Sequence, residues 1–502
     1  NGKGYSFKPF QNITTAESAA FIYRMLQLVV VPTPTPAPEP MPELTPTPVP
    51  ELTPESTPPS TKDLYQVGTL DSSGQVTASS ETFATFDEAN QAMTNETTQV
   101  IVYNDKIMKM PSGIAFTTPT SGYTTLYSNV GLSSLYAGVS RQNELEYVTS
   151  DADKVTVKVA GKIAYVKHSE VTLYPSHEKM KRNYYTVNDS GDLLLRKYNH
   201  ITKAYVSTST VGKAPSSFSV NGEYYSWDGA TFTDKEGKNV GTYYQYFNML
   251  PIRTSTNYTA AELDAIIMAN LEQREGLYKS SPSANARYKD ATTKSKLVGL
   301  GEALKEVEAT HKMNALMVLA WAISESDFGM STIALTKNNL FGIQAYDNNI
   351  NAAKSYSKAE DSIVDLSDSF VNKNYVPLTG DYANGGMLGN KARGMNVRYA
   401  TDPYWGQIIA GHIYLLDKAA GGKDFSNNES PYSLYETTSD ILNVRSTPEL
   451  IATNKLFTYP RPGYIVTVLE TTGEWSKVLS DDRENTYAYV FSEYIKQLPI
   501  AK

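Results

Sequence analysis

The segment LMVLAWAISESDFG, residues 316–329, constrains the fold more than any other stretch of the sequence. Apolar residues from Met313 to Ile323 recur at spacings of three and four, which predicts a buried α-helix. Glu325 stands where this apolar run ends, so we expect its carboxyl group to lie against the hydrophobic core at the C-terminal end of a helix. An exposed glutamate just beyond the helix is the alternative.

A carboxyl group in that position has a specific chemical use. Burial disfavours the charged form of a carboxyl group, and the negative end of the helix dipole opposes ionisation as well. A carboxylic acid that keeps its proton near neutral pH is what a glycosidase needs to protonate a leaving oxygen. Glu325 is therefore a candidate general acid.

Length and composition narrow the class of protein. The chain has 502 residues, enough for several domains, and its 40% apolar content suits ordinary cores. No apolar run approaches the ~18 residues of a membrane span, and a net charge of -8 does not predict nucleic-acid binding. The absence of cysteine excludes disulfides. Five scattered histidines without a close pair predict neither a metal site nor a cofactor.

The N-terminal part predicts an attachment region and a spacer. FKPFQNITTAESAAFIYRML, within residues 1–28, reads as a loop and a capped helix, and it resembles the last part of an S-layer homology repeat. The resemblance implies a cell-surface location; a generic capped helix is the alternative. Residues 29–62 form a Pro/Thr-rich linker, since twelve of the 26 prolines lie between positions 32 and 59.

Short alternating segments predict β-rich modules on both sides of a helical region. Residues 63–110 are expected to form a small α/β module with a capped helix at TFDEANQAM, residues 111–175 an SH3-like β module, and residues 176–249 a β-rich linking module. Residues 431–498 resemble a bacterial SH3-type wall-binding domain in ILNVRSTP, GEWSKV and TYAYVFSEYI. AYV followed by SE occurs at Ala164 and again at Ala488, which indicates two related small barrels.

Residues 250–424 carry helical periodicity and three separated motifs. These are ESDFG from Glu325, KNNLFGI from Lys337, and YATDPYW from Tyr399 to Trp405. In this order they closely resemble glycoside hydrolase family 73. Its members are endo-β-N-acetylglucosaminidases that cut bacterial peptidoglycan and have a lysozyme-like, α-rich fold. The resemblance implies that residues 250–424 form a glucosaminidase catalytic domain.

The resemblance also implies roles for individual residues. Glu325 matches the general acid, and Asn339 and Phe341 match a segment that shapes the floor of a substrate cleft. Tyr399, Tyr404 and Trp405 match aromatic residues near the sugar. Either tyrosine is a candidate for binding the acetamido group or orienting a water, and Tyr404 is our catalytic candidate of the two; packing is the alternative for all three.

The second catalytic group is less well defined by the sequence. Asp347 is the first candidate because it follows the KNNLFGI motif directly. Glu360 and Asp361 read more simply as the start of a helix, and Asp402, which precedes a proline, as part of a turn. The substrate's own acetamido oxygen is a further alternative to a second carboxylate.

These expectations combine into one functional hypothesis. We expect a multidomain α+β protein with a lysozyme-like α-rich catalytic domain flanked by small SH3-like β-barrel modules. It is expected to be secreted and associated with the cell wall or S-layer, with peptidoglycan glycan strands as substrate and wall polymers bound by the flanking modules. A muramidase or lytic transglycosylase on the same fold is one alternative. A non-catalytic wall-binding S-layer protein is the other.

Overall fold

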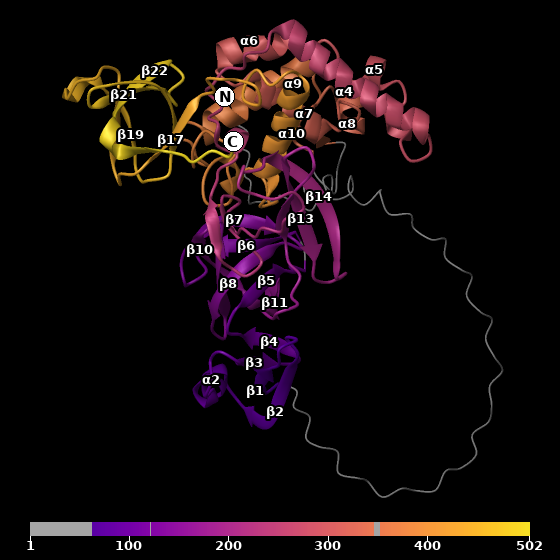
Figure 1. Ribbon diagram of the computed structural model, residues 1–502, viewed down its shortest axis with the longest axis vertical. Coiled ribbons are helices and arrows are strands. Elements are labelled where there is room, and N and C mark those ends of the chain that lie inside the picture. Colours follow the sequence, from indigo (N-terminus) through magenta and orange to yellow (C-terminus); the bar gives the residue numbers. More distant parts are fainter. Residues whose placement is uncertain (1–62, 121, 346–351) are drawn as a thin grey trace, which may run out of the picture.

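The computed structural model describes residues 63–120, 122–345 and 352–502. It shows a mixed α/β protein of several units (Figure 1). The helices and the C-terminal sheet form a bar, and the sheets of the N-terminal half form a stem beneath it. The predicted S-layer repeat (1–28), the whole predicted linker (29–62) and Asp347 lie outside the described residues.

The far end of the stem is a four-stranded antiparallel sheet with one helix. Its strand order is β2-β1-β3-β4, with bounds β1 Tyr65–Leu70, β2 Val76–Phe83, β3 Gln99–Tyr103 and β4 Lys106–Lys109. The predicted capped helix is confirmed as α2, Phe86–Ala92. Thr85 and Glu88 form a capping box at its start, which satisfies backbone N–H groups that the first helical turn leaves unpaired.

A seven-stranded antiparallel sheet follows, in the order β11-β5-β8-β9-β10-β6-β7. Its strands are β5 Gly113–Thr117, β6 Tyr123–Tyr127, β7 Leu135–Ser140, β8 Glu144–Ser150, β9 Lys154–Val159, β10 Lys162–Lys167 and β11 Val171–Pro175, with the 3-10 turn η1 at His168–Glu170. Alternating Val side chains of β9 and β10 supply much of its core, in agreement with the alternation of the sequence.

The C-terminal sheet repeats this connectivity. Read from the β23 edge, its order is β23-β17-β20-β21-β22-β18-β19, so each strand has a counterpart at the same position in the earlier sheet as written above. The strands are β17 Ser433–Thr437, β18 Leu442–Arg445, β19 Lys455–Tyr459, β20 Ile465–Thr472, β21 Trp475–Leu479, β22 Tyr487–Phe491 and β23 Ile495–Gln497. The two AYV segments lie in the equivalent strands β10 and β22, each followed by a 3-10 turn.

The predicted barrels are open sheets in their backbone pairing. Within the described residues, β11 and β7 end one sheet and β19 and β23 end the other, without a ladder that joins the two edges. The β7 edge turns instead towards the helical unit, where Ser140 N–H donates to Thr401 O at 2.9 Å. An edge strand covered in this way has its backbone groups satisfied without barrel closure. The SH3-type assignment stays a prediction.

The linking module joins the stem to the bar. It contains a three-stranded sheet, β12 Tyr184–Val187, β13 Asp192–Asn199 and β14 Ala204–Lys213, and a hairpin, β15 Thr231–Thr233 and β16 Asn239–Thr242. The helix α10, Trp405–Ala419, packs directly on β14. Gly411 permits this approach, because an added Cβ would lie 1.8 Å from the carbonyl oxygen of Thr210.

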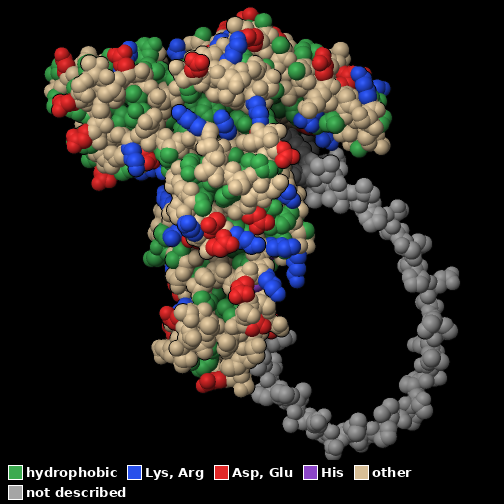
Figure 2. All heavy atoms as spheres, in the orientation of Figure 1, with side chains coloured by type: hydrophobic (Ala, Val, Ile, Leu, Met, Phe, Trp, Pro, Cys, Tyr) green, Lys and Arg blue, Asp and Glu red, His purple; other side chains and the backbone are tan. Residues whose placement is uncertain are grey.

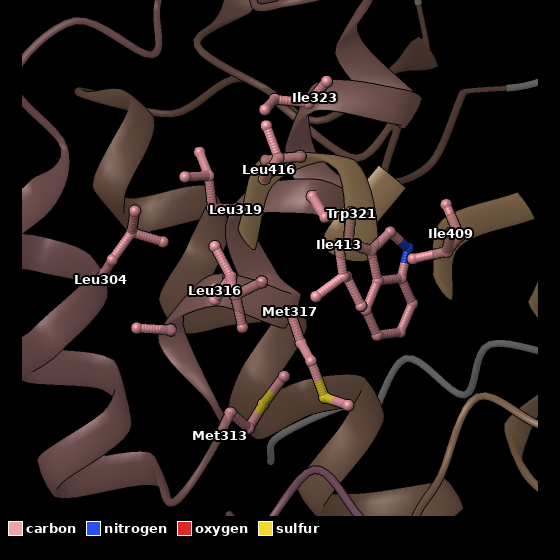
Figure 3. Packing of buried hydrophobic residues seen from close by; sticks show 14 of the residues in the cluster. Leu304, Met313, Leu316, Met317, Leu319, Trp321, Ile323, Ile409, Ile413 and Leu416 are labelled. Carbon is pink, nitrogen blue, oxygen red and sulfur yellow. The ribbon is translucent and has the colours of Figure 1, made fainter. Parts of the chain in front are cut away.

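The helical unit surrounds α7, Ala315–Ser326, which is buried on almost every side (Figure 3). Figure 3 shows Leu316, Met317 and Trp321 of α7 packed among side chains of α10 and α6. The other elements are α3 Tyr246–Met249, α4 Ala260–Ser280, α5 Ala291–Lys294, α6 Gly301–His311, α8 Thr332–Lys337, α9 Ala359–Asp365 and the π-helical η4 Leu366–Tyr375.

The C-terminal sheet is fastened to this unit at several points. Arg393 pairs with Glu436 at 3.0 Å, and a parallel β-bridge joins Tyr244 to Ile500. In that bridge Tyr244 N–H donates to Pro499 O at 2.8 Å and Ala501 N–H donates to Tyr244 O at 2.9 Å. None of the helices in the described ranges is long and apolar enough to span a bilayer.

Candidate active site

The end of α7 is a turn with an unusual backbone. Asp327, Phe328 and Gly329 all have positive φ, at 51°, 60° and 70°. Ser326 stabilises the turn, because its hydroxyl donates to Ala322 O and accepts from Gly329 N–H at 2.8 Å. Left-handed residues after a helix are a common way to end it, but three in succession are costly without such side-chain support.

Neighbouring segments hold the same turn from outside. The Asp327 carboxylate pairs with Arg287 at 2.7 Å and accepts a hydrogen bond from the Tyr288 hydroxyl at 2.6 Å. A Cβ at Gly329 would lie 2.5 Å from Ser295 Oγ and 2.9 Å from Leu297 N. The ESDFG motif is therefore a rigid helix end, and it fixes the position of Glu325 in the last helical turn.

Glu325 is half-buried at this helix end, as the sequence predicts. Its Oε1 accepts a hydrogen bond of 3.2 Å from the indole Nε1 of Trp405. Trp405 is the first residue of α10 and is only 4% exposed. The end of one core helix and the start of another thus meet at the carboxyl group.

Aromatic rings form a continuous wall beside Glu325. The ring of Tyr399 lies 4.6 Å from that of Trp405, and Trp321 lies 4.7 Å from Tyr399 and 5.2 Å from Trp405. The wall continues through Tyr375 to Tyr382, with centroid distances of 5.6 and 5.4 Å. Tyr399 and Tyr382 are half-buried, so part of each ring remains available to solvent. Trp321, Tyr375 and Trp405 are buried, so Tyr399 and Tyr382 are the two rings of the wall that offer a face to a sugar.

The KNNLFGI motif shapes the segment after α8. The Asn339 amide donates to Ile343 O and Lys354 O, both at 2.9 Å, and accepts from the N–H groups of Phe341 and Ile343. Asn339 is 1% exposed and Phe341 7% exposed. The contacts agree with the cleft-shaping role; direct sugar contact by these two residues stays a prediction.

Tyr404 faces away from the aromatic wall. Its hydroxyl accepts a hydrogen bond of 2.9 Å from Asn183 Nδ2, and its ring packs with the core of the linking module. Burial raises its pKa well above the ordinary value, with a further contribution from the charge of Glu144. These contacts match the packing alternative that the sequence left open, and the catalytic role of Tyr404 stays a prediction.

The other candidate carboxylates take part in local structure. Asp361 closes a hydrogen-bonded cap at the start of α9, next to Glu360. Asp402 Oδ1 accepts from Tyr404 N–H at 2.9 Å, so it sets a turn as the sequence predicts. Among the described residues there is no group of three or more His, Asp and Glu side chains placed to hold a metal ion.

Tyr375 and Tyr382 were not identified from the sequence. Tyr375 ends the π-helical segment η4, and Tyr382 follows it after a turn. Neither lies in one of the three motifs. A π-helix inside an α-helical stretch is often associated with a functional site, but no residue pattern in LSDSFVNKNY distinguishes it from an α-helix.

Comparisons with known proteins find partial matches to this chain. Residues 301–418, from α6 to α10, match the family model "Glucosaminidase: Mannosyl-glycoprotein endo-beta-N-acetylglucosaminidase". Two curated proteins from different strains of Streptococcus pneumoniae, both described as putative endo-beta-N-acetylglucosaminidase, are 30% identical over 277 residues, which is 55% of this chain. The match covers 36% and 34% of their lengths, so the chain spans about a third of these relatives.

Solved structures of a staphylococcal autolysin are also similar in part. Autolysin E of S. aureus matches 35% of this chain and 72% of its own, with 16% identity and a TM-score of 0.24. A catalytic mutant of Autolysin E in complex with the disaccharide NAG-NAM matches 37% of this chain and 83% of its own, with 16% identity and a TM-score of 0.25.

Proposed function

We propose that this chain is an endo-β-N-acetylglucosaminidase that hydrolyses the β-1,4 bond between N-acetylglucosamine and N-acetylmuramic acid in peptidoglycan, in cell-wall turnover or cell separation. The observation that carries the proposal is Glu325, held at the rigid end of a buried helix and bonded to Trp405 beside an aromatic wall. The glucosaminidase family match over residues 301–418 and the curated relatives support the same reaction class.

In the proposed mechanism Glu325 donates a proton to the glycosidic oxygen while the sugar lies along the aromatic wall. Trp405 orients the carboxyl group by its hydrogen bond to Oε1, and the protonated carboxyl group donates to the leaving oxygen. Tyr399 contributes a ring face and a hydroxyl at the sugar. The second group is Asp347 or the acetamido oxygen of the substrate, and in either case it stabilises the positive charge that develops at the anomeric carbon.

The remaining parts of the chain are proposed to act in attachment. The two sheets of equal connectivity, within residues 111–175 and 431–498, are proposed as wall-binding modules of SH3 type. The N-terminal region is proposed to locate the protein at the cell surface. Modules that hold an enzyme on a polymeric substrate raise the effective concentration of cleavable bonds without changing the intrinsic rate.

Mass spectrometry of reduced muropeptides tests the reaction. Digestion of purified walls by the wild-type chain is expected to release fragments that end in reduced N-acetylglucosamine. Glu325→Gln keeps the shape and the hydrogen-bond acceptor but cannot supply a proton, so release should fall by at least about a hundredfold. Reduced muramic ends would instead identify a muramidase. No release by a folded wild-type chain would contradict the enzymatic function.

A further inference from the structure

Three units of the chain meet beside the aromatic wall, and each contributes a cationic side chain. Lys162 comes from β10 of the stem sheet, Arg398 from the loop of the helical unit that precedes Tyr399, and Arg461 from the turn before β20 of the C-terminal sheet. Figure 2 shows Lys and Arg side chains gathered where the bar of the molecule joins the stem. We refer to these three residues as the junction cations.

Contacts place the junction cations around one strand edge. The Lys162 Nζ lies 3.9 Å from the centroid of the Tyr136 ring, and Arg398 Nη2 donates to the neighbouring Leu135 O at 3.4 Å. The Tyr136 hydroxyl donates to the backbone oxygen of Lys391, which ties β7 to the same loop of the helical unit. Arg461 reaches this loop from the other side, where its Nη2 donates to Asn384 Oδ1 at 3.3 Å.

The three positive charges influence one another. Partial burial, together with the charges of Arg461 and Arg398, lowers the pKa of Lys162. Burial also lowers the pKa of Arg398. Within the part of the chain that the structure describes, neither Lys162 nor Arg461 has a carboxylate at ion-pair distance, and the nearby Glu436 is paired with Arg393. Gathered like charges repel, and a bound anion would remove that cost.

The junction cations lie on the continuation of the aromatic wall. Asn384, which holds Arg461, donates through its side-chain amide to Tyr382 O at 3.2 Å. The half-buried rings of Tyr382 and Tyr399 both contact the buried ring of Tyr375, and Tyr399 contacts Trp405, the partner of Glu325. A polymer that extends from Glu325 over the half-buried rings of Tyr399 and Tyr382 would reach the cations, and an anionic branch on that polymer would meet them.

We propose that Lys162, Arg398 and Arg461 bind a carboxylate of the peptide branch carried by the glycan strand, while the sugars lie along the aromatic wall. This inference rests on the proposed function. Arg side chains bind carboxylates with two parallel hydrogen bonds, and a lysine adds a point charge on a flexible stem. Because the site needs all three units, it gives the stem sheet and the C-terminal sheet a direct part in substrate selection.

Kinetics on three substrates test the proposal. These are peptide-bearing glycan strands, the same strands after an amidase has removed the peptides and freed the lactyl carboxylates, and uncharged N-acetylglucosamine oligomers. Lys162→Met keeps the apolar stem on Tyr136, and Arg461→Gln keeps a donor for Asn384. Each is expected to reduce the preference for peptide-bearing strands over uncharged oligomers about tenfold, through KM rather than kcat. Added salt should reduce the wild-type preference in the same way.

Matched controls remove exposed lysines from the same units. Lys167→Met, at the other end of β10, and Lys496→Met, on β23, should leave the preference unchanged. Arg461→Lys should restore part of the preference for peptide-bearing strands that Arg461→Gln loses, because lysine returns the positive charge but not the planar guanidinium group.

The other outcomes separate the inference from the proposed function. An equal loss on all three substrates would show a structural role and overturn the inference. A preference that persists on amidase-treated strands and still falls in the variants would assign the cations to the lactyl carboxylate instead of the peptide. If the Lys162 and Arg461 variants are active and their KM values are unchanged, the inference is wrong and the proposed function still stands. If the wild type cleaves nothing, sedimentation with peptide-bearing and amidase-treated strands still decides whether the junction cations bind the peptide.

Discussion

The indole Nε1 of Trp405 donates a hydrogen bond of 3.2 Å to Oε1 of Glu325. The two residues are far apart in the sequence, and they belong to the ends of two helices that cross in the core of the helical unit. Trp405 is only 4% exposed, so its N–H has little access to water and the hydrogen bond holds the carboxyl group in one orientation.

Trp405→Phe tests that orientation. The substitution keeps an aromatic ring but removes the donor, and we expect kcat to fall about tenfold, because the neutral carboxyl group loses the hydrogen bond that orients it. Trp321→Phe is the control, because Trp321 is buried in the same wall and its Nε1 has no hydrogen-bond partner in the described part of the chain. Both variants should lose about 1–3 kcal/mol of stability to the smaller ring. Equal kcat values in the two variants would contradict the orienting role.

Gly329→Ala tests the rigid helix end. An alanine is strained in the left-handed backbone conformation of this position. Its Cβ would also lie 2.9 Å from the backbone N of Leu297, so the free energy of unfolding should fall by about 3 kcal/mol. Gly299 provides the comparison, since it has φ of +76° but nothing within 4 Å of an added Cβ. Gly299→Ala should cost only about 1 kcal/mol. Urea unfolding of both variants measures the difference, and similar losses would show that the contacts around Gly329 yield easily.

Tyr404→Phe distinguishes catalysis from packing. If Tyr404 only packs, the variant loses one hydrogen bond from Asn183 and about 1 kcal/mol of stability, with kcat unchanged within about threefold. Tyr399→Phe should lower kcat/KM more, because the half-buried Tyr399 lies in the wall beside Glu325. Steady-state rates on glycan strands decide between the two. Loss of turnover in a folded Tyr404→Phe protein would support the catalytic role predicted from the sequence.

The raised pKa of Asp481 predicts that the stability of the protein depends on pH. Burial raises its pKa to about 6, although the hydrogen bond from Tyr459 and the charge of Arg253 act in the opposite direction. The folded state therefore holds this proton more tightly than the unfolded state, whose pKa is ordinary. Stability should rise by about 2 kcal/mol as the pH falls from about 7 to about 4, with most of the change below pH 6. The comparison of wild type with Asp481→Asn by urea unfolding at both pH values isolates this contribution.

The expected result is a difference between the two proteins that shrinks as the pH falls. The asparagine carries no charge at any pH, and its carbonyl still accepts from Tyr459. A pH-independent difference would mean that the pKa of Asp481 is the same in the folded and unfolded states, which would contradict the burial effect. Unfolding should be followed by a signal from the C-terminal sheet, because a chain of several units need not unfold in one step.

Local patterns predicted the elements that depend on nearby residues. The helix that ends at Glu325 follows from apolar spacing, and the cap of α2 follows from Thr85 and Glu88. The repeated AYV segment indicated two related modules, and the equal connectivity of the two sheets agrees with that indication.

Features that depend on distant contacts were not predictable from such patterns. The predicted barrels are open sheets, and the β7 edge of the first one bonds to Thr401 of the helical unit, which is far away in the sequence. Tyr375 and Tyr382 join the aromatic wall only through the path of η4 and the turn after it. The direction of the Tyr404 side chain is set by Asn183 in another module, so its motif position could not distinguish packing from catalysis.

The bridge between Tyr244 and Ile500 has a consequence for the order in which the chain assembles. Tyr244 ends the linking module, and its backbone N–H and C=O are both satisfied by residues 499–501. Before residues 499–501 have left the ribosome, Tyr244 has no partner for its backbone groups. Closing the long loop between Tyr244 and these residues is slow compared with folding within each unit. Docking of the C-terminal sheet is therefore a late step of biogenesis, and the junction with the stem is completed only after synthesis has passed the last bridge residue.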